Sequence, residues 1–357
     1  MIMKPQINYD RLDLGLMSPL DSPLVVYIET TTRCNLACKF CPHFLSPDDF
    51  IKGTMKFSLF SKCVLDLKDF NPKIKLLRFC GLGDSLFNKE IAKFVEHAVV
   101  NEVADRYEMI SNGLLLTKEL SDKLSTHLDR LIISIEGLSD EDYVNFTNRN
   151  INFYKFIDQL IYFYSIKNRK CKLHIKIHNS AVQSSERLQK FYDIFNSISD
   201  EIYVENLINL WPNLISNLGL DSGHRFDGNV IRKRKVCAQI FKSIQINHDG
   251  KILPCCIDWR VVNVIGDINA NSLISIWNGK PMNDLRVKHL SGQRDKLGPC
   301  SGCTMNEESD IDNIDLHSDE IFQRLEQKYR NKDIYNEILL PQGARNLLGV
   351  IKMFNLS

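Results

Sequence analysis

The sequence predicts an α/β fold with a parallel sheet, followed by a smaller cysteine-rich C-terminal domain, and three observations favour this fold class. From Leu24 to about Asn206, six short apolar stretches alternate with stretches of helical periodicity, the pattern of βαβ units. Seven of the 11 cysteines fall into two spaced groups that suit metal ligation. The 357 residues, 44% of them hydrophobic, are enough for more than one domain.

The elements follow in chain order after a proline-containing lead segment, residues 1–23, which we expect to wrap the first strand. The predicted strands are Leu24–Thr30, Lys75–Cys80, Tyr107–Ile110, Leu131–Ile135, Lys172–Ile177 and Glu201–Glu205. The predicted helices between them are Ser58–Asp69, Lys89–Asn101, Lys118–Thr126, Phe153–Ser165 and Ser185–Ser197. Six strands that alternate with helices imply parallel βαβ units with right-handed crossovers.

A polar loop directly after the first strand carries Cys34, Cys38 and Cys41 in a Cys-x3-Cys-x2-Cys spacing. Thiolates are soft ligands for iron–sulfur clusters and zinc. Three thiolates leave a four-iron cluster with one open position, as a catalytic metal site needs. Structural zinc, with His43 as fourth ligand, is the alternative.

The second cysteine group consists of Cys237, Cys255, Cys300 and Cys303. The stretch from Phe241 to Pro254 predicts a hairpin, with Asp249-Gly250 as its turn, that brings Cys237 and Cys255 to one end. Four thiolates complete a four-iron cluster, and structural zinc is again the alternative.

Three helical or apolar segments are predicted in this C-terminal part. Ser272–Leu290 is expected to be largely helical, Ile321–Leu340 to be an amphipathic helix, and Leu347–Phe354 to be an apolar tail. We expect the last two to pack back onto the barrel, with a partner or membrane-surface contact as the alternative.

Glycine-rich and polar turns follow the predicted strands. Gly81-Leu82-Gly83-Asp84-Ser85 follows the second strand, and its glycines allow backbone to approach a ligand closely. The alternative is an ordinary strand-to-helix turn, with Asp84 or Ser85 as a helix cap. Ser111-Asn112-Gly113 and Ser134-Ile135-Glu136-Gly137 follow the third and fourth strands.

The cysteine loop, with Phe40 before its third cysteine, resembles the signature of the radical S-adenosylmethionine (SAM) superfamily. The resemblance implies a partial (β/α)6 barrel with its active site at the C-terminal strand ends. It implies a [4Fe-4S] cluster on Cys34, Cys38 and Cys41, with SAM on the fourth iron. Reductive cleavage of SAM would give a 5′-deoxyadenosyl radical that abstracts a substrate hydrogen.

The resemblance also extends to SAM-binding positions. The Gly81 turn resembles the family's Gly-Gly-Glu-Pro, with Leu82 inserted and Asp84 in place of Glu. The implied cofactor-binding residues are Phe40, Gly81, Gly83, Asp84, Ser111, Asn112, Ser134, Glu136 and Arg149. Arg149 would grip the SAM carboxylate, for which a guanidinium is suited, and a solvated surface arginine is the alternative.

The second cysteine group resembles the SPASM/twitch extension of radical SAM enzymes. Because no cysteine follows Cys303, the shorter twitch form with one auxiliary [4Fe-4S] cluster fits better. Its cysteine spacing resembles that of the aminocyclitol dehydrogenases that oxidise 2-deoxy-scyllo-inosamine. We therefore divide the chain into a lead segment (1–23), a radical SAM barrel (24–236), an auxiliary-cluster domain (237–303) and a helical extension (304–357).

Composition limits the partners and the location. A net charge of +1 provides no field for nucleic acid. The sequence contains no run of 18 apolar residues that would predict a membrane span, and no signal peptide is recognised in it. We expect a cytoplasmic enzyme with a flavodoxin- or ferredoxin-type electron donor.

Oxidation of a secondary alcohol, in a sugar, aminocyclitol or nucleotide sugar, is the first functional hypothesis, with the auxiliary cluster as electron acceptor. His224 and Arg225 are base candidates, and the run Arg232–Lys235 is a candidate phosphate site whose alternative is a solvated face. The second hypothesis is an epimerase that uses Cys80 or Cys256 as hydrogen donor. Maturation of a ribosomal peptide and a non-enzymatic, metal-stabilised interaction module complete the alternatives.

Overall fold

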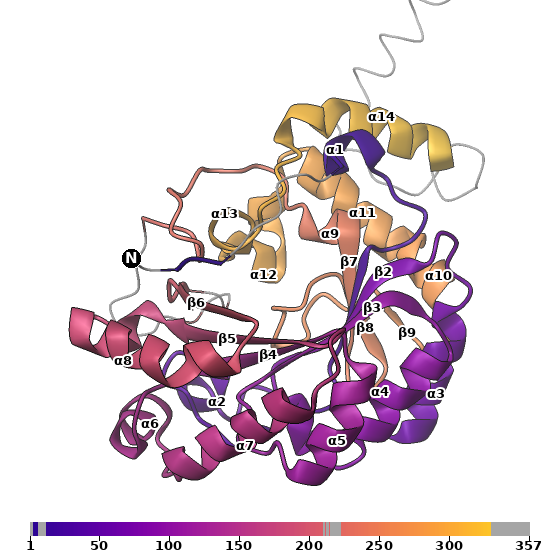
Figure 1. Ribbon diagram of the computed structural model, residues 1–357. Helices are drawn as coiled ribbons and strands as arrows, with labels where there is room; N and C mark the ends of the chain where they lie inside the picture. The colour runs from indigo at the N-terminus through magenta and orange to yellow at the C-terminus, as the bar shows by residue number, and fades with distance from the viewer. Residues whose placement is uncertain (1–2, 6–11, 210, 212–213, 215–222, 330–357) are drawn as a thin grey trace, which may run out of the picture.

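The computed structural model (Figure 1) describes residues 3–5, 12–209, 211, 214 and 223–329. At its centre is one sheet with the strand order β6-β5-β4-β3-β2-β1-β7-β8-β9. All six predicted barrel strands are present and run parallel. Their bounds are β1 Val25–Ile28, β2 Ile74–Phe79, β3 Ala104–Ser111, β4 Arg130–Ile135, β5 Lys172–His178 and β6 Glu201–Glu205.

Helices cover the outer face of these strands, as Figure 1 shows. The predicted five are α3 Phe57–Leu67, α4 Ile91–Val100, α5 Lys118–His127, α7 Phe153–Ile166 and α8 Ser185–Phe195. Alternate strand residues are buried against them. Phe79 of β2, for example, lies 6.1 Å from the ring of Phe60, which stacks on Phe94 at 4.4 Å. This aromatic contact fixes α3 and α4 on the sheet.

The opposite, inward face of the same strands is polar and charged. Arg78 of β2 pairs with Glu108 of β3 at 2.6 Å, and Arg130 of β4 reaches the same carboxylate at 3.4 Å. The Glu108 side chain is only 2% exposed, so two guanidiniums compensate one buried charge. The barrel interior is therefore built around charge networks rather than apolar packing.

The predicted C-terminal hairpin forms and extends the barrel sheet. Its strands are β7 Ser243–Ile246 and β8 Lys251–Leu253, followed by the short β9 Gly266–Asp267. β7 pairs in parallel with β1 over its whole length, from Val25 opposite Ser243 to Ile28 opposite Ile246. The auxiliary-cluster region is thus hydrogen-bonded to the first barrel strand.

The remaining helices surround this hairpin. The predicted helical stretch Ser272–Leu290 is two helices, α10 Leu273–Trp277 and α11 Lys280–Leu290, because Asn278-Gly279 interrupts it. Short elements complete the described chain: α1 Leu14–Met17, α2 Pro42–Leu45, η1 Ser85–Phe87, α6 Asp140–Thr147, η2 Asn179–Ala181, η3 Asn196–Ile198, α9 Gln239–Lys242, η4 Arg294–Lys296, α12 Gly298–Ser301, α13 Met305–Glu308 and η5 Asp315–His317.

The C-terminal extension is held by a buried charge cluster. Lys242 Nζ lies 2.6 Å from a carboxylate oxygen of both Asp310 and Asp312. Arg234, from the predicted phosphate-binding run, donates to the carbonyls of the same two residues. That arginine is therefore engaged in holding the extension.

The amphipathic helix predicted from Ile321 corresponds to α14, Ser318–Tyr329. It packs on α11 and on α1, at one end of the molecule in Figure 1, and buries Ile321 and Leu325. The part of the predicted helix after residue 329 and the predicted tail Leu347–Phe354 lie outside the described residues.

Candidate active site

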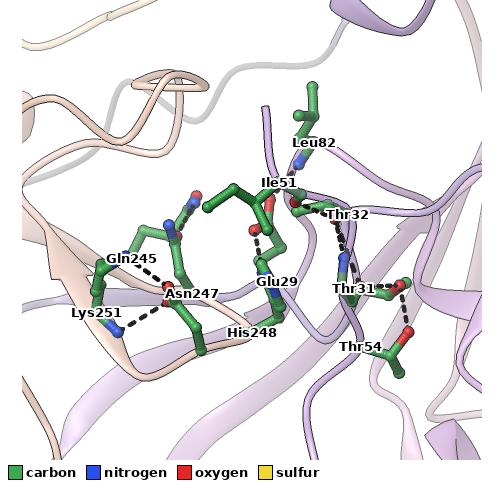
Figure 2. A network of polar contacts seen from close by, with 12 residues as sticks. Glu29, Thr31, Thr32, Ile51, Thr54, Leu82, Gln245, Asn247, His248 and Lys251 are labelled. Atoms are coloured by element: carbon green, nitrogen blue, oxygen red, sulfur yellow. Dashed lines mark hydrogen bonds and ion pairs between the residues drawn. The ribbon is translucent and has the colours of Figure 1, made fainter. Parts of the chain in front are cut away.

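The cysteine loop begins at the C-terminal end of β1, where threonine side chains hydrogen-bond to residues 51–54 (Figure 2). Thr31 Oγ donates to the Gly53 carbonyl at 2.8 Å, and Thr32 Oγ donates to the Ile51 carbonyl at 2.9 Å. Thr31 and Thr54 also share a hydroxyl contact of 2.9 Å. These threonines leave the strand and are buried, so their hydroxyls need partners, and residues 51–54 supply them.

The Gly81–Gly83 turn lies directly against this loop. The amide of Asp84 donates to the Arg33 carbonyl at 3.0 Å. A Cβ at Gly83 would lie 2.6 Å from the Arg33 carbonyl oxygen and closer still to the Thr31 oxygen. Glycine is therefore required where the turn meets the loop.

The side chain of Glu29 contacts the same Gly81–Gly83 turn. Its buried carboxylate accepts a 2.7 Å hydrogen bond from the Leu82 amide, and its other oxygen lies 3.6 Å from Nδ1 of His248 in the hairpin (Figure 2). A Cβ at Gly81 would lie 2.5 Å from Cγ of Glu29. The turn, the first strand and the hairpin thus share one buried carboxylate.

The carboxylate of Asp84 connects the turn after β2 with the end of β3 through hydrogen bonds. Its carboxylate accepts from the Ser111 hydroxyl at 2.9 Å, the Asn112 amide at 2.7 Å and the Leu86 amide at 2.9 Å. Burial raises the pKa of Asp84, against these hydrogen bonds. The alternative of a helix cap is therefore realised, because the Leu86 bond caps η1, while the carboxylate also orients Ser111 and Asn112.

Asn112 connects the third strand end to the cysteine loop. Its side-chain amide donates to Asn35 Oδ1 at 2.8 Å and lies 3.8 Å from Cys34 Sγ. On the other side of the loop, the Ala37 and Lys39 amides donate to the carbonyls of Thr147 and Phe146. These contacts hold the loop from both sides.

A cavity of about 340 Å³ opens at these strand ends. It brings together the three loop cysteines and almost all predicted SAM contacts: Cys34, Cys38, Cys41, Phe40, Gly81, Gly83, Asp84, Ser111, Asn112, Ser134 and Glu136. Arg149 is exposed and does not line this cavity. The structure therefore does not bring the predicted carboxylate-binding arginine to the site.

The three loop thiols fit a shared cluster. All three face the cavity, and burial raises the pKa of Cys34 and of Cys41 to about 12. Neutral buried thiols are the form expected before a metal supplies the compensating charge. Within the described ranges no three His, Cys, Asp or Glu side chains are close enough to hold a single metal ion; a cubane separates its thiolates more widely than one ion does.

His43, the fourth zinc ligand considered above, lies elsewhere. It belongs to α2, its ring contacts Phe50 at 4.9 Å, and it is absent from the residues that line the cavity. The structure thus provides three thiols and no imidazole from this loop, as a cluster with one open iron requires.

Two buried polar groups in the cavity lack hydrogen-bond partners among the described residues. These are Glu136 Oε2, after β4, and both ring nitrogens of His178, at the end of β5. They face each other, with Nε2 3.6 Å from Oε2. Phe40 and Phe146 flank the imidazole edge-on, at 5.6 and 4.8 Å.

Burial determines the protonation of this pair. It raises the pKa of Glu136 to about 8, against the opposing charge of Lys176, and it lowers the pKa of His178 to about 4. Near neutral pH the carboxyl is protonated and the imidazole is neutral. The pair therefore carries no net charge and retains the capacity to accept a proton.

Three further residues that line the cavity, His178, Lys176 and Glu205, are absent from the predicted site. Lys176 and Glu205 form an ion pair at 2.5 Å across β5 and β6. The sequence of β5 contains a pattern that could have indicated these residues. In a strand covered on both faces, residues are expected to be apolar throughout, whereas β5 places His174, Lys176 and His178 at alternate positions.

The second cysteine group converges as predicted on one small pocket. Cys237 precedes α9, Cys255 follows β8, and Cys300 and Cys303 flank the end of α12. The four thiols line the pocket together with both apolar and polar side chains, and burial raises the pKa of Cys300 and of Cys303 to about 12. Four thiols and no open position fit a fully ligated four-iron cluster.

The four remaining cysteines separate into two kinds. Cys63 and Cys171 are fully buried in the main core, where a thiol acts as a small apolar side chain. Cys80 lines the main cavity. Cys256 lines a separate pocket of about 80 Å³ beside Glu29 and His248.

Comparison with known families matches both parts of this architecture. Residues 28–178 match the radical SAM superfamily, and residues 237–304 match an iron–sulfur cluster-binding domain, SPASM. The first range spans β1 to β5, and the second begins at Cys237 and ends just after Cys303. Within the part of the chain that the structure describes, no helix is both long and apolar enough to cross a membrane.

Curated relatives are distant. A GTP 3′,8-cyclase of Staphylococcus epidermidis is 24% identical over 229 residues, 62% of each chain. The FeMo cofactor biosynthesis protein NifB of Methanocaldococcus jannaschii is 23% identical over 214 residues, 52% of this chain and 67% of NifB. The chain thus spans less than two thirds of the cyclase.

Solved structures share the fold at low sequence identity. BtrN in complex with AdoMet and 2-DOIA superposes with a TM-score of 0.53 at 17% identity, over 82% of this chain and 95% of BtrN. Streptococcus suis SuiB bound to precursor peptide SuiA gives a TM-score of 0.51 at 13% identity, over 83% of this chain and 72% of SuiB. Together, the matched ranges and the two converging cysteine sites show a radical SAM domain, which implies a [4Fe-4S] cluster with SAM, followed by a SPASM-type iron–sulfur cluster-binding domain.

Proposed function

We propose that this enzyme oxidises a secondary alcohol of a sugar, aminocyclitol or nucleotide sugar to a ketone. When bound, the cluster and SAM supply a carbon-centred radical that removes a hydrogen atom from the carbinol carbon. The hydroxyl proton and one further electron must then leave the substrate. The chain therefore needs a proton acceptor in the cavity and an electron acceptor nearby.

The observation that carries the proposal is the buried pair of Glu136 and His178, whose facing atoms lie 3.6 Å apart and make no other side-chain hydrogen bond among the described residues. Asp84 is already occupied by Ser111, Asn112 and Leu86, and Lys176 is occupied by Glu205. His178 is neutral near pH 7 because burial lowers its pKa, so it can take the hydroxyl proton. His178 replaces His224 and Arg225 in this role, since neither of those lines the cavity.

The electron acceptor is the auxiliary cluster on Cys237, Cys255, Cys300 and Cys303. The electron left after loss of the hydrogen atom and the proton would pass to this cluster, and the substrate would become a ketone. The hairpin that carries Cys255 is hydrogen-bonded to β1 through β7. The resemblance in fold to BtrN, solved with AdoMet and 2-DOIA, supports a small cyclic substrate, and we expect a flavodoxin- or ferredoxin-type donor for the first cluster.

The test uses anaerobically reconstituted enzyme, dithionite, SAM and candidate alcohols deuterated at the carbinol carbon, beginning with 2-deoxy-scyllo-inosamine. We expect deuterium in 5′-deoxyadenosine and one ketone per SAM consumed. The variant His178→Phe should still cleave SAM without substrate turnover, whereas ketone formation should fall at least about 100-fold, the usual contribution of a general base. Ketone formation at the wild-type rate in this variant would exclude His178 as the proton acceptor.

Epimerisation is a second candidate, because Cys80 lines the main cavity and could return a hydrogen atom to a substrate radical. Cys256 is less suited to this role, since it lines the separate pocket beside Glu29. Turnover in D₂O distinguishes the two functions. An epimerase would incorporate solvent deuterium into its product, and Cys80→Ala would abolish incorporation while Cys256→Ala would not.

A further inference from the structure

Four polar side chains line the auxiliary-cluster pocket in addition to its four cysteines. They are His289 of α11, Arg294 at the start of η4, Asn263 before β9, and Asp258, whose carboxylate accepts hydrogen bonds from the amides of Val262 and Asn263. His289 is fully buried and Arg294 is 9% exposed.

The orientation of His289 follows from one hydrogen bond. The Cys237 amide donates to Nδ1 of His289 at 3.4 Å. Because Nδ1 accepts, the ring hydrogen of the neutral imidazole is on Nε2. Nε2 is buried and has no partner among the described residues, while the ring lines the pocket of the four thiols. The imidazole is therefore a buried donor without an acceptor among the described residues.

Arg294 and Asn263 also place a positive charge and a hydrogen-bond donor near the cysteine ligands. Arg294 donates from its guanidinium to the carbonyl of Cys303, which fixes a positive charge beside a ligand. The Asn263 side-chain amide donates to Cys300 Sγ at 3.8 Å. Hydrogen bonds to cluster sulfurs and nearby positive charge stabilise the reduced state of a cluster, because that state is more negative.

We propose that His289 and Arg294 tune the auxiliary cluster, raising its reduction potential so that it accepts an electron. They are tuning residues, since neither is a ligand. The inference deepens the proposed electron-acceptor role, but it concerns a property of the cluster that exists without substrate. It can therefore hold even if the substrate of the enzyme is not an alcohol.

The experiment is an anaerobic redox titration followed by electron paramagnetic resonance. The Cys34→Ala/Cys38→Ala/Cys41→Ala background leaves the auxiliary cluster as the signal-giving group. In it, His289→Leu removes the donor and His289→Gln keeps an N–H group; Arg294→Met removes the charge and Arg294→Lys keeps it. Iron content of about four per chain establishes that each variant is loaded.

At the midpoint potential of the parent, we expect the reduced-to-oxidised ratio to fall about tenfold in His289→Leu and in Arg294→Met, equivalent to about 59 mV for a one-electron couple. His289→Gln and Arg294→Lys should recover most of this shift. Unchanged midpoints in loaded Leu and Met variants would overturn the proposal. Because the two positions are tested separately, failure of one variant to load leaves the other decisive.

Discussion

Gly83 offers a sharp test of the close contact between the Gly81–Gly83 turn and the cysteine loop. A methyl group at this position would lie 2.6 Å from the Arg33 carbonyl oxygen, 0.8 Å short of the 3.4 Å at which ordinary contact begins, and it would lie closer still to the Thr31 oxygen. Both obstacles are backbone atoms on a loop held by Thr31, Thr32 and Asn112. Neither can rotate away as a flexible side chain could.

We therefore expect Gly83→Ala to cost about 3 kcal/mol, the upper end for overpacking, and to lower SAM affinity about 100-fold. The measurements are equilibrium binding of SAM and iron content, with the auxiliary cluster as internal control. Because the strain falls on the first cluster, iron should fall from about eight towards about four per chain.

The matched control is Gly292→Asn. Gly292 has a positive φ of 68°, and no heavy atom lies within 4 Å of the position that a Cβ would take there; asparagine tolerates that backbone region. This variant should keep its iron and its SAM affinity. If Gly83→Ala also kept full SAM affinity and both clusters, the proximity of the turn to the loop would have no energetic importance and the reasoning would be wrong.

Three further predictions concern separate parts of the molecule. Cys303→Ser should remove the auxiliary cluster alone, so iron analysis should give about four atoms per chain with SAM cleavage retained; an unchanged iron count would contradict the ligand set. Burial raises the pKa of Glu136 to about 8, so this carboxyl should lose its proton as the pH rises through that value. The charged carboxylate should then repel the SAM carboxylate, and SAM affinity should fall above pH 8. The Glu136→Gln variant should flatten this pH profile of SAM affinity. Lys242→Met leaves the Asp310 carboxylate buried without its partner and should cost about 3–5 kcal/mol in urea unfolding, whereas Lys242→Arg should retain most of the stability.

The order of strands and helices could be predicted from the sequence because each barrel strand has a local apolar pattern. Helix α6, Asp140–Thr147, was missed although Ser139 caps it through the Asp142 amide and three acidic residues fill its first turn. That capping pattern was readable. The pairing of β7 with β1 could not be predicted from the sequence, because residues 25 and 243 are far apart along the chain and no local signal indicates which strand a hairpin joins.

The candidate site divides in the same way. Clustered cysteines and glycine turns were found because their spacing is local, and the structure brings them to shared pockets. His178 and His289 were missed because each is a single polar residue within an otherwise ordinary strand or helix. Arg149 was selected by resemblance and lies exposed, since its position depends on the path of the loop after α6 and not on residue type.

The shared edge between β1 and β7 affects how this protein can be divided for experiments. A chain cut before Cys237 would strip the hydrogen-bonding partners from Val25 to Ile28 and leave an apolar strand open on one side. Such an edge readily recruits another molecule. Separate expression of the barrel should therefore yield aggregates, and a soluble half-enzyme would first need a substitute strand to occupy that place.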